Sequence, residues 1–181
     1  GWLEGNVVEG PEGRLWNLLR FNAQDPDAPA GERWDTACLV GIEDNATRLS
    51  FDPRTGFLDF PGGHTKFTIR RDPASGLYLT LSNGNLDPAR PTQRAVLSLY
   101  RSDNLRTWQH AAVLLDDDSG LSYEDSFRFT GFQYVDWHFD GDDIIYLVRT
   151  AYDGADTFHN ANRITFHRIA GFRRLAAGAC R

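Results

Sequence analysis

One pattern recurs three times along this chain of 181 residues and limits the folds that it can adopt. Each copy has an opening apolar run, a tight turn containing Gly, a longer apolar run and one or two further short runs. The opening runs are NVVEG near residue 6, KFTIRRD near residue 66 and YVDWHF near residue 134. Short runs rich in Val, Ile, Leu, Phe and Tyr between turn residues are typical of β-strands, and helical periodicity is hard to find.

The spacing of these repeats predicts the architecture. A period of about 60 residues with four strands per unit is typical of a β-propeller blade, and an ordinary antiparallel sandwich is the alternative. We predict an all-β fold of three four-stranded antiparallel blades in one partial domain, at residues 1–61, 62–125 and 126–181. The third blade is expected to end in a short strand at FRRL. The junctions 52–64 and 116–130, rich in Pro, Gly, Asp and Ser, are expected to be loops.

Three blades do not close a ring, because propellers typically have four to eight. An open set leaves sheet faces and edges exposed. We therefore expect the chain to associate with a missing N-terminal half of the same propeller or with another copy of itself. The sequence contains no Met, even at position 1, so we expect a fragment or a processed product.

Composition excludes several partners. The formal net charge of −6 argues against nucleic acid, and no apolar stretch is long enough to span a membrane. Cys38 and Cys180 are too few for a disulfide framework and are expected to be free thiols. The positive charge is almost all arginine, since Lys66 is the only lysine. Arginine forks bind carboxylates in a bidentate way, which lysine cannot do.

Four charged or phenolic residues occupy comparable places in the successive blades. Glu4 precedes the opening strand of the first blade, and Arg20 ends the next strand sixteen positions later (20 − 4 = 16). Because one strand leaves the rim and the other returns to it, we expect these two side chains to lie close together. Arg94 precedes a strand of the second blade, and Tyr134 begins the third.

The segment RAVLSLYRSDNLRTW contains a degenerate Asp-box, a turn motif that reads roughly Ser-x-Asp-x-Gly-x-Thr-Trp. Asp103, Thr107 and Trp108 match it, whereas Arg101 and Leu105 replace the serine and the glycine. We expect a structural role, in which Trp108 packs between blades and Asp103 binds turn amides. The segment also fits the Ser-x-Asp-Leu-x-x-Trp turn of five-bladed furanosidases.

The stretches LEGNVVEGPEGRLWNLLR, RAVLSLYRSDNLRTW and GFQYVDWHFDGDDIIYLVR together resemble the later half of the sialidases, which are Asp-box β-propeller glycoside hydrolases. Sialidases use a tyrosine nucleophile. The resemblance implies half of a six-bladed propeller, with Tyr134 as the nucleophile and Glu4 as the acceptor of its proton. It also implies that Arg20 and Arg94 bind a substrate carboxylate. Arg149 stands where many sialidases have Glu.

The physical requirements of that reaction also show what the chain lacks. A phenol, with a pKa near 10, becomes a nucleophile at neutral pH only if a base accepts its proton and cations stabilise the phenolate. In the sialidases the general acid and the first arginine of the carboxylate-binding triad come from the early blades, and no residue here takes their places. We therefore predict that this chain alone is inactive on sialosides. The resemblance favours a secreted or periplasmic location.

Other polar residues lie at the predicted blade rims. We expect Asp136, Arg149, His64, His159 and Asn160 to contact the substrate. The last two belong to RTAYDGADTFHNANRITFHR, and a dense polar loop containing Gly is typical of a sugar-facing loop or a cation site. We predict that this loop binds the sugar substrate, and we expect no metal and no cofactor. The phrases FPGGHTKFTIR, GFQYVDWHFDGDDII and HNANRITFHRI resemble bacterial sialidase-like hydrolases.

Three functions are consistent with these patterns. The first is a retaining sialidase-like exo-glycosidase, in which Tyr134 attacks the anomeric carbon of a terminal carboxylated sugar with Glu4 as base. The second is a five-bladed-type hydrolase of neutral or furanose sugars, with Asp136 and Glu4 as a general acid/base pair. The third is a carbohydrate-binding propeller without chemistry, because fold does not fix function.

Overall fold

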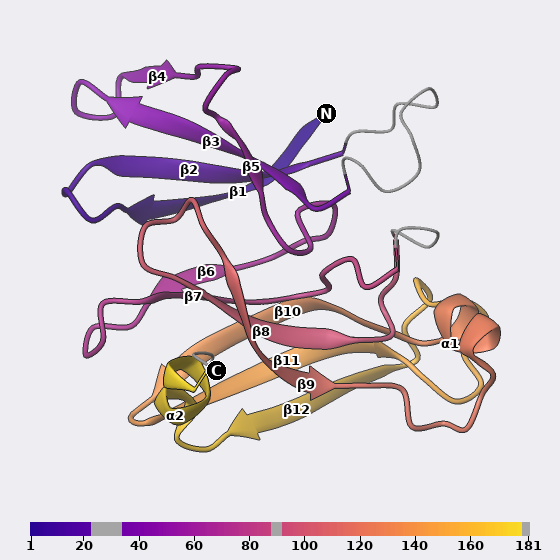
Figure 1. The fold of residues 1–181 in the computed structure, drawn as a ribbon. Coiled ribbons are helices and arrows are strands. Elements are labelled where there is room, and N and C mark those ends of the chain that lie inside the picture. Colours follow the sequence, from indigo (N-terminus) through magenta and orange to yellow (C-terminus); the bar gives the residue numbers. More distant parts are fainter. Residues whose placement is uncertain (23–33, 88–91, 179–181) are drawn as a thin grey trace.

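The computed structural model describes residues 1–22, 34–87 and 92–178. Within these ranges the chain forms three antiparallel sheets that follow one another in sequence, with two short helices beside them (Figure 1). The predicted all-β fold of propeller-like blades is confirmed. Neither helix is long and apolar enough to cross a membrane.

The first sheet has five strands where four were predicted. They are β1 (Trp2–Glu9), β2 (Leu15–Phe21), β3 (Thr36–Glu43), β4 (Arg48–Ser50) and β5 (Phe57–Asp59). The first four pair in chain order, and β5 pairs with the start of β3. Treating all of 52–64 as a loop was therefore wrong at β5. A strand of three residues carries too little alternation to be recognised, and only its pairing with β3 defines it.

The second sheet has the expected four strands. They are β6 (Ile69–Arg71), β7 (Tyr78–Ser82), β8 (Leu97–Ser102) and β9 (Gln109–Leu115). They pair in chain order, and all of β7 is buried. Strand β7 is therefore covered on both faces, and the second sheet lies between the first and the third (Figure 1).

The Asp-box loop between β8 and β9 is held by residues other than the predicted one. The Ser102 hydroxyl accepts a hydrogen bond from the Leu105 amide (2.9 Å), and Asn104 Oδ1 accepts from the next two amides at 2.8 Å each. Assigning the turn amides to Asp103 was wrong, because the polar side chains on either side of it bind them. Leu105 has φ 65°, a left-handed conformation, where the family motif has Gly.

The third sheet has three strands instead of four. They are β10 (Gly131–Asp140), β11 (Asp143–Ala151) and β12 (Arg163–Ile169). The predicted strand at FRRL is wrong, since these residues lie in helix α2 (Phe172–Ala177). Gly171, with φ 58°, turns the chain out of the sheet, and Phe172 is then fully buried with its ring 5.3 Å from that of Phe139.

A helix also interrupts the predicted loop 116–130. Helix α1 (Tyr123–Phe129) begins at Ser122, whose hydroxyl accepts a hydrogen bond from the Asp125 amide (3.2 Å). Glu124 and Asp125 place negative charge in the first turn, which favours the positive end of the helix dipole. Seven residues show too little periodicity for the sequence to reveal this helix.

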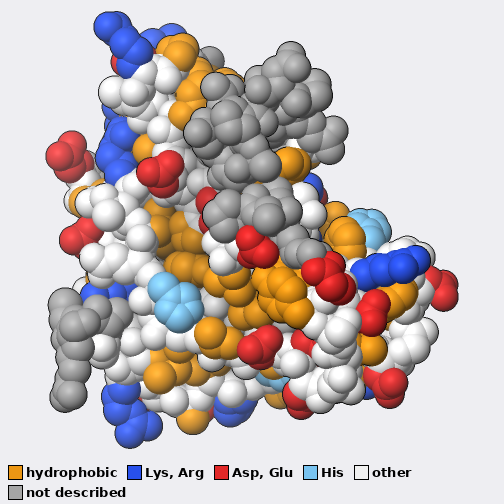
Figure 2. Space-filling view, turned by 45° about the vertical axis from the view of Figure 1, so that its right-hand side comes forward, with side chains coloured by type: hydrophobic (Ala, Val, Ile, Leu, Met, Phe, Trp, Pro, Cys, Tyr) orange, Lys and Arg blue, Asp and Glu red, His pale blue; other side chains and the backbone are white. Residues whose placement is uncertain are grey.

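Two apolar clusters join the sheets. One packs Leu18 and Leu39 of the first sheet against Phe60, Phe67 and residues of the second. Trp108 contributes to it as predicted, with its ring 4.9 Å from that of Phe60. The other lies between the second and third sheets and includes Leu81, Leu99, Trp137, Ile144, Val148 and Phe172. Figure 2 shows that apolar side chains also gather in the middle of one face, bordered by acidic groups.

The first strands of the three sheets lie side by side, with β6 in the middle (Figure 1). Asn6 of β1 donates to the Phe67 carbonyl and accepts from the Ile69 amide, both at 3.2 Å. On the other side, Trp137 Nε1 of β10 donates to the Thr68 carbonyl (3.0 Å). Each sheet therefore turns its first strand toward its neighbours, as the blades of a propeller do around their axis.

Candidate functional site

A β-bulge interrupts β1 at Glu4. Between Leu3 and Asn6, β1 advances by three residues while β2 advances by two, from Arg20 to Leu18, so β1 holds one extra residue. Glu4 has φ 42°, and a left-handed conformation costs a residue other than Gly about 1–2 kcal/mol. Such strain is concentrated at functional sites. The bulge therefore marks Glu4 as a residue with a constrained position.

An equivalent bulge interrupts β10 at Tyr134. Between Gln133 and Asp136, β10 advances by three residues while β11 advances by two, from Arg149 to Leu147. Tyr134 has φ 53°, so it adopts the same left-handed conformation as the bulge residue of β1. In both sheets an arginine stands opposite the residue that precedes the bulge. The two sheets thus repeat one local structure with different side chains.

Arg20 is held on two sides. Its Nη1 lies 3.0 Å from Glu4 Oε2, and its Nε donates to the His64 carbonyl at 2.9 Å. The Arg20 side chain is 18% exposed and that of Glu4 35%, so the pair is partly shielded from water. The structure therefore brings Glu4 and Arg20 together, as expected from their order along the hairpin.

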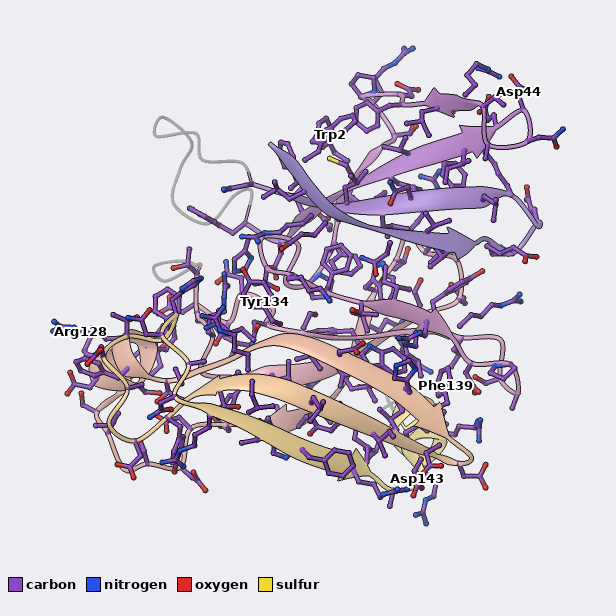
Figure 3. The ribbon with its side chains drawn as sticks, turned by 180° about the vertical axis from the view of Figure 1, so that it is seen from behind. Trp2, Asp44, Arg128, Tyr134, Phe139 and Asp143 are labelled. Carbon is purple, nitrogen blue, oxygen red and sulfur yellow. The ribbon has the colours of Figure 1, made fainter. Side chains whose placement is uncertain are left out.

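Arg149, Tyr134 and His159 form a second group of contacts. The Arg149 guanidinium lies 5.3 Å from the centre of the Tyr134 ring, a cation–π contact, and Nη2 donates to the His159 carbonyl (2.8 Å). The His159 ring stands nearly perpendicular to that of Tyr134, with 6.5 Å between centroids. Tyr134 remains 38% exposed, on the side of β10 that faces the first sheet (Figure 3).

Arg94 is close enough to both groups for one residue of each, Arg20 and Tyr134, to affect its pKa. The pKa of its guanidinium is lowered to about 10, mainly by burial and also by the positive charge of Arg20, while Tyr134 acts in the opposite direction. Arg94 makes no ion pair within the described residues; its only donor contacts are long ones of 3.4 Å to the carbonyls of Thr92 and Gln93. A largely buried cation without a carboxylate partner is a natural site for negative charge.

Asn83 fixes the backbone beneath Arg94, and the sequence analysis missed it. Its Nδ2 points at the carbonyl oxygens of Arg94 (3.4 Å), Val96 (2.8 Å) and Phe132 (2.9 Å), and the residue is 2% exposed. The Phe132 amide also donates to the Arg94 carbonyl (2.8 Å). These bonds tie the segment of Arg94 to the start of β10. No local pattern marks Asn83, because its partners lie as far as 49 residues away.

Asp136 follows the bulge of β10 and is largely exposed. Its Oδ1 lies 3.6 Å from Nη2 of Arg70, which comes from β6. The same arginine donates through Nε to the Trp137 carbonyl (2.6 Å) and so links the two strands. Asp136 and Glu4 therefore lie on the two strands that flank β6, each with an arginine beside its carboxylate.

His64 and Asn160 are placed differently from one another. The His64 ring is buried, with Nδ1 2.8 Å from the Trp34 carbonyl and 3.3 Å from Asp35 Oδ1, while Nε2 has no hydrogen-bond partner. Its carbonyl, not its ring, reaches the site through Arg20. Asn160 is exposed beside His159, and its side chain makes no hydrogen bond within the described ranges.

Together these residues place carboxylates, guanidinium groups and an exposed phenol on or beside the first strands of the three sheets. This set can bind sugar hydroxyls and stabilise developing charge. In the part of the chain that the structure describes, the Tyr134 hydroxyl and Glu4 make no hydrogen bond to each other, so proton transfer between them stays a prediction. No group of three or more His, Cys, Asp or Glu residues in the described ranges could hold a metal ion.

Comparisons with known proteins identify the fold. No protein-family model matches the sequence, and no curated protein does. An α-L-arabinofuranosidase of Fusarium graminearum, solved with an iminosugar inhibitor, aligns with a TM-score of 0.56 and 13% identity over 94% of this chain and 45% of its own. An α-L-arabinanase of Penicillium chrysogenum, complexed with arabinobiose, gives 0.53 and 16% over 92% and 45%.

Both neighbours are glycoside hydrolases, and neither is a sialidase. At these identities the likeness shows the fold alone, and it agrees with the partial propeller. The chain spans less than half the length of either neighbour.

Proposed function

We propose that this chain forms part of a propeller glycoside hydrolase that acts on a furanose sugar. The supporting observation is that the candidate site, on the first strands of the sheets, lies in a fold similar to those of an α-L-arabinofuranosidase and an α-L-arabinanase. Since the chain spans 45% of each of them, the activity would belong to a protein in which further blades complete the ring.

The contacts of the arginines favour a neutral sugar over a carboxylated one. A clamp for a substrate carboxylate needs guanidinium forks that are free to bind it. Arg20 is instead bound to the Glu4 carboxylate and the His64 carbonyl. A substrate carboxylate at Arg20 would have to displace Glu4.

The proposed chemistry uses the two carboxyl groups on the strands that flank β6. Glu4, oriented by Arg20, attacks the anomeric carbon or activates the water that does so. Asp136 donates a proton to the glycosidic oxygen as the bond between that oxygen and the anomeric carbon breaks. In this scheme Tyr134, held by Arg149 and flanked by His159, contacts the sugar ring and is not the nucleophile.

One observation favours a second candidate, the cleavage of a carboxylated sugar by Tyr134 and Glu4. Arg94 is a largely buried cation without a carboxylate partner in the described ranges, close enough to Arg20 and Tyr134 for their charges to affect its pKa. Either a substrate carboxylate or a Tyr134 phenolate would neutralise it.

Two substrates distinguish the candidates. A longer polypeptide that contains this chain and the blades completing the ring would be assayed with an activated α-L-arabinofuranoside and an activated sialoside. We expect turnover of the arabinofuranoside only. Turnover of the sialoside, with loss of activity in Arg94→Gln, would support the second candidate instead.

The chain by itself is expected to be inactive on both substrates, because a partial ring leaves the site open on one side. Groups that act as a unit do not contribute additively, and the loss of one member can remove most of the rate. Robust turnover by purified residues 1–181 would show that the site is complete within them.

Exposed apolar surfaces support the need for further blades. On the third sheet Leu147, Ile164 and Phe166 are 47%, 69% and 62% exposed, and Leu147 pairs directly with Phe166. On the first sheet Val7 and Leu49 are 63% and 65% exposed. We propose that both surfaces pack against the remaining blades of the same propeller. A stable dimer of the isolated chain in light scattering would favour a second copy as the partner.

A further inference from the structure

A second polar groove lies at the opposite end of the first two sheets from Glu4 and Arg20. Its walls come from the turn between β1 and β2, the loop between β4 and β5, and the Asp-box loop. Trp16, at its centre, pairs with Val8, four residues from Glu4 along β1 (8 − 4 = 4). Four residues span about 13 Å in a strand, so the groove is separate from the candidate glycosidase site.

Two guanidinium groups lie against the Trp16 indole. Arg14 is 4.1 Å from the ring centroid and Arg106, from the Asp-box loop, is 5.5 Å away. The faces of an aromatic ring attract cations. The indole therefore holds two positive charges near each other at the junction of two sheets, a position that requires compensating negative charge.

Only one of these charges is neutralised within the described residues. Arg14 Nη2 lies 2.6 Å from Glu43 Oε1 and donates to Ser50 Oγ at 3.1 Å. Arg106 donates through Nη1 to the Thr55 carbonyl (3.0 Å) and has no carboxylate partner in the described ranges. A guanidinium carries five N–H donors, so most of those of Arg106 remain available.

Two cavities flank this stack and share its three side chains as a common wall. One, of about 280 Å³, also has Ser50, Asp52 and Thr55 in its lining. The other, of about 380 Å³, also has Glu12 and Asn104. Their sizes lie near the lower end of the range for small-molecule sites. The linings combine the Arg106 guanidinium, which has no carboxylate partner in the described ranges, with hydroxyl and amide groups and one carboxylate in each cavity, and this mixture suits a small polar ligand.

We propose that this groove binds a carboxylate ligand of monosaccharide size, such as a uronic acid. The planar fork of Arg106 matches a carboxylate in a bidentate way, and the neighbouring polar groups can bind sugar hydroxyls. Glu12 and Asp52 oppose any larger negative charge, so a ligand with one carboxylate is favoured over a phosphate dianion. This site is independent of the proposed glycosidase function.

Calorimetric titration of the chain with glucuronate tests this, with glucose and inorganic phosphate as comparison ligands. We expect saturable glucuronate binding in the millimolar range, weaker at high salt, and no binding of glucose or phosphate. Arg106→Gln should weaken binding by about tenfold or more, and Arg106→Lys should give an intermediate loss because it keeps the charge without the fork. Tyr134→Phe should have no effect.

Arg54→Gln is the matched control. Arg54 lies on the loop between β4 and β5, its side chain is 91% exposed, and it is outside both cavity linings. The proposal fails if glucose binds as well as glucuronate, if phosphate binds more tightly, or if Arg54→Gln weakens binding as much as Arg106→Gln. It also fails if wild-type chain binds no glucuronate at tens of millimolar. Should Arg106→Gln not fold, Arg106→Lys decides.

Discussion

In the first sheet the bulge of β1 presents a carboxylate, Glu4, to Arg20, whereas in the third sheet the equivalent bulge of β10 presents a phenol, Tyr134, to Arg149. The bulge residue and its arginine are separated by nearly the same distance along the chain in the two sheets, 16 residues (20 − 4) in the first and 15 residues (149 − 134) in the third. One backbone geometry therefore carries two chemistries, an ion pair and a cation–π contact. The repeat sets the position of each side chain, and the residue type sets what it can do there.

The two sheets also differ in how they are attached to the sheet between them. The first is joined by an apolar cluster and by Asn6. The third has an apolar cluster and, in addition, a charged link through helix α2. Arg173 Nη2 and Nε lie 2.7 and 2.8 Å from the two oxygens of Asp72, which is fully buried beside β6. We expect the third sheet to be the more sensitive to pH.

The largest expected effects distinguish the two bulge residues. In a longer protein that contains this chain and the blades completing the ring, Glu4→Gln should lower turnover of an arabinofuranoside by roughly 10²–10⁴-fold, because a general base or nucleophile is lost. Tyr134→Phe keeps the ring and its contact with Arg149, so we expect less than about a tenfold loss. Steady-state kinetics of both variants measures this. Equal, near-complete loss in the two would identify Tyr134 as a reacting group and favour the sialidase-like mechanism.

The next effect concerns the charged link of the third sheet. Arg173→Gln leaves the Asp72 carboxylate buried without its ion partner and should lower the Tm by roughly 5–10 °C near neutral pH. Arg174→Gln, at the exposed neighbouring position of α2, is the control and should change the Tm little. Thermal unfolding followed by circular dichroism measures both. A similar Tm for the two variants would mean that apolar packing alone holds this sheet.

The same pair predicts a pH dependence. Hydrogen bonds from Arg173 have the largest effect on the pKa of Asp72 and lower it, burial raises it by less, and hydrogen bonds from the Ser75 hydroxyl and nearby amides lower it further. A lowered pKa in the folded state gives stability that is present above the ordinary carboxyl pKa of about 4 and lost as the pH falls below it. We therefore expect the Tm difference between wild type and Arg173→Gln to shrink below about pH 4. A constant difference would contradict the role of this ion pair.

The smallest expected effects are on the free energy of unfolding, when either of the two arginines opposite the bulges is replaced. Arg20→Gln removes a partly shielded ion pair and should cost about 1 kcal/mol of unfolding free energy. Arg149→Gln removes a cation–π contact at an exposed ring and should cost about 0.5 kcal/mol. Urea denaturation of the two variants would measure the difference. A larger loss for Arg149 would show that its bond to the His159 carbonyl contributes more than its contact with Tyr134.

Much of the fold could be predicted from local patterns. The three opening strands, the Gly turns and the packing of Trp108 follow from alternation and turn chemistry, which act over a few residues. The elements that were missed are short: β5 with three residues, α1 with seven and α2 with six. Their conformation depends on pairing with β3, on the cap at Ser122 and on the burial of Phe172, and a short segment does not encode such contacts in a period.

The candidate site shows the same division. The order of Glu4 and Arg20 on two connected strands was enough to predict that they meet, because a hairpin brings its ends together. The sequence could not predict that Arg20 would form an ion pair with Glu4 instead of remaining available to a substrate carboxylate, or that the His64 ring would be buried. Both depend on how the segment before β6 packs against the first sheet.

The sequence by itself determined the repeated strand pattern, the excess of arginine and the order of the charged residues along the blades. Only the tertiary structure decided that Glu4 and Tyr134 share one kind of bulge, that Asn83 joins Arg94 to β10, and that Arg14 and Arg106 meet on Trp16. The physical reason is the range of the forces involved. Alternation and turns are set by neighbouring residues, whereas bulge register, buried hydrogen bonds and charge pairing are set by strands distant in sequence that pack together.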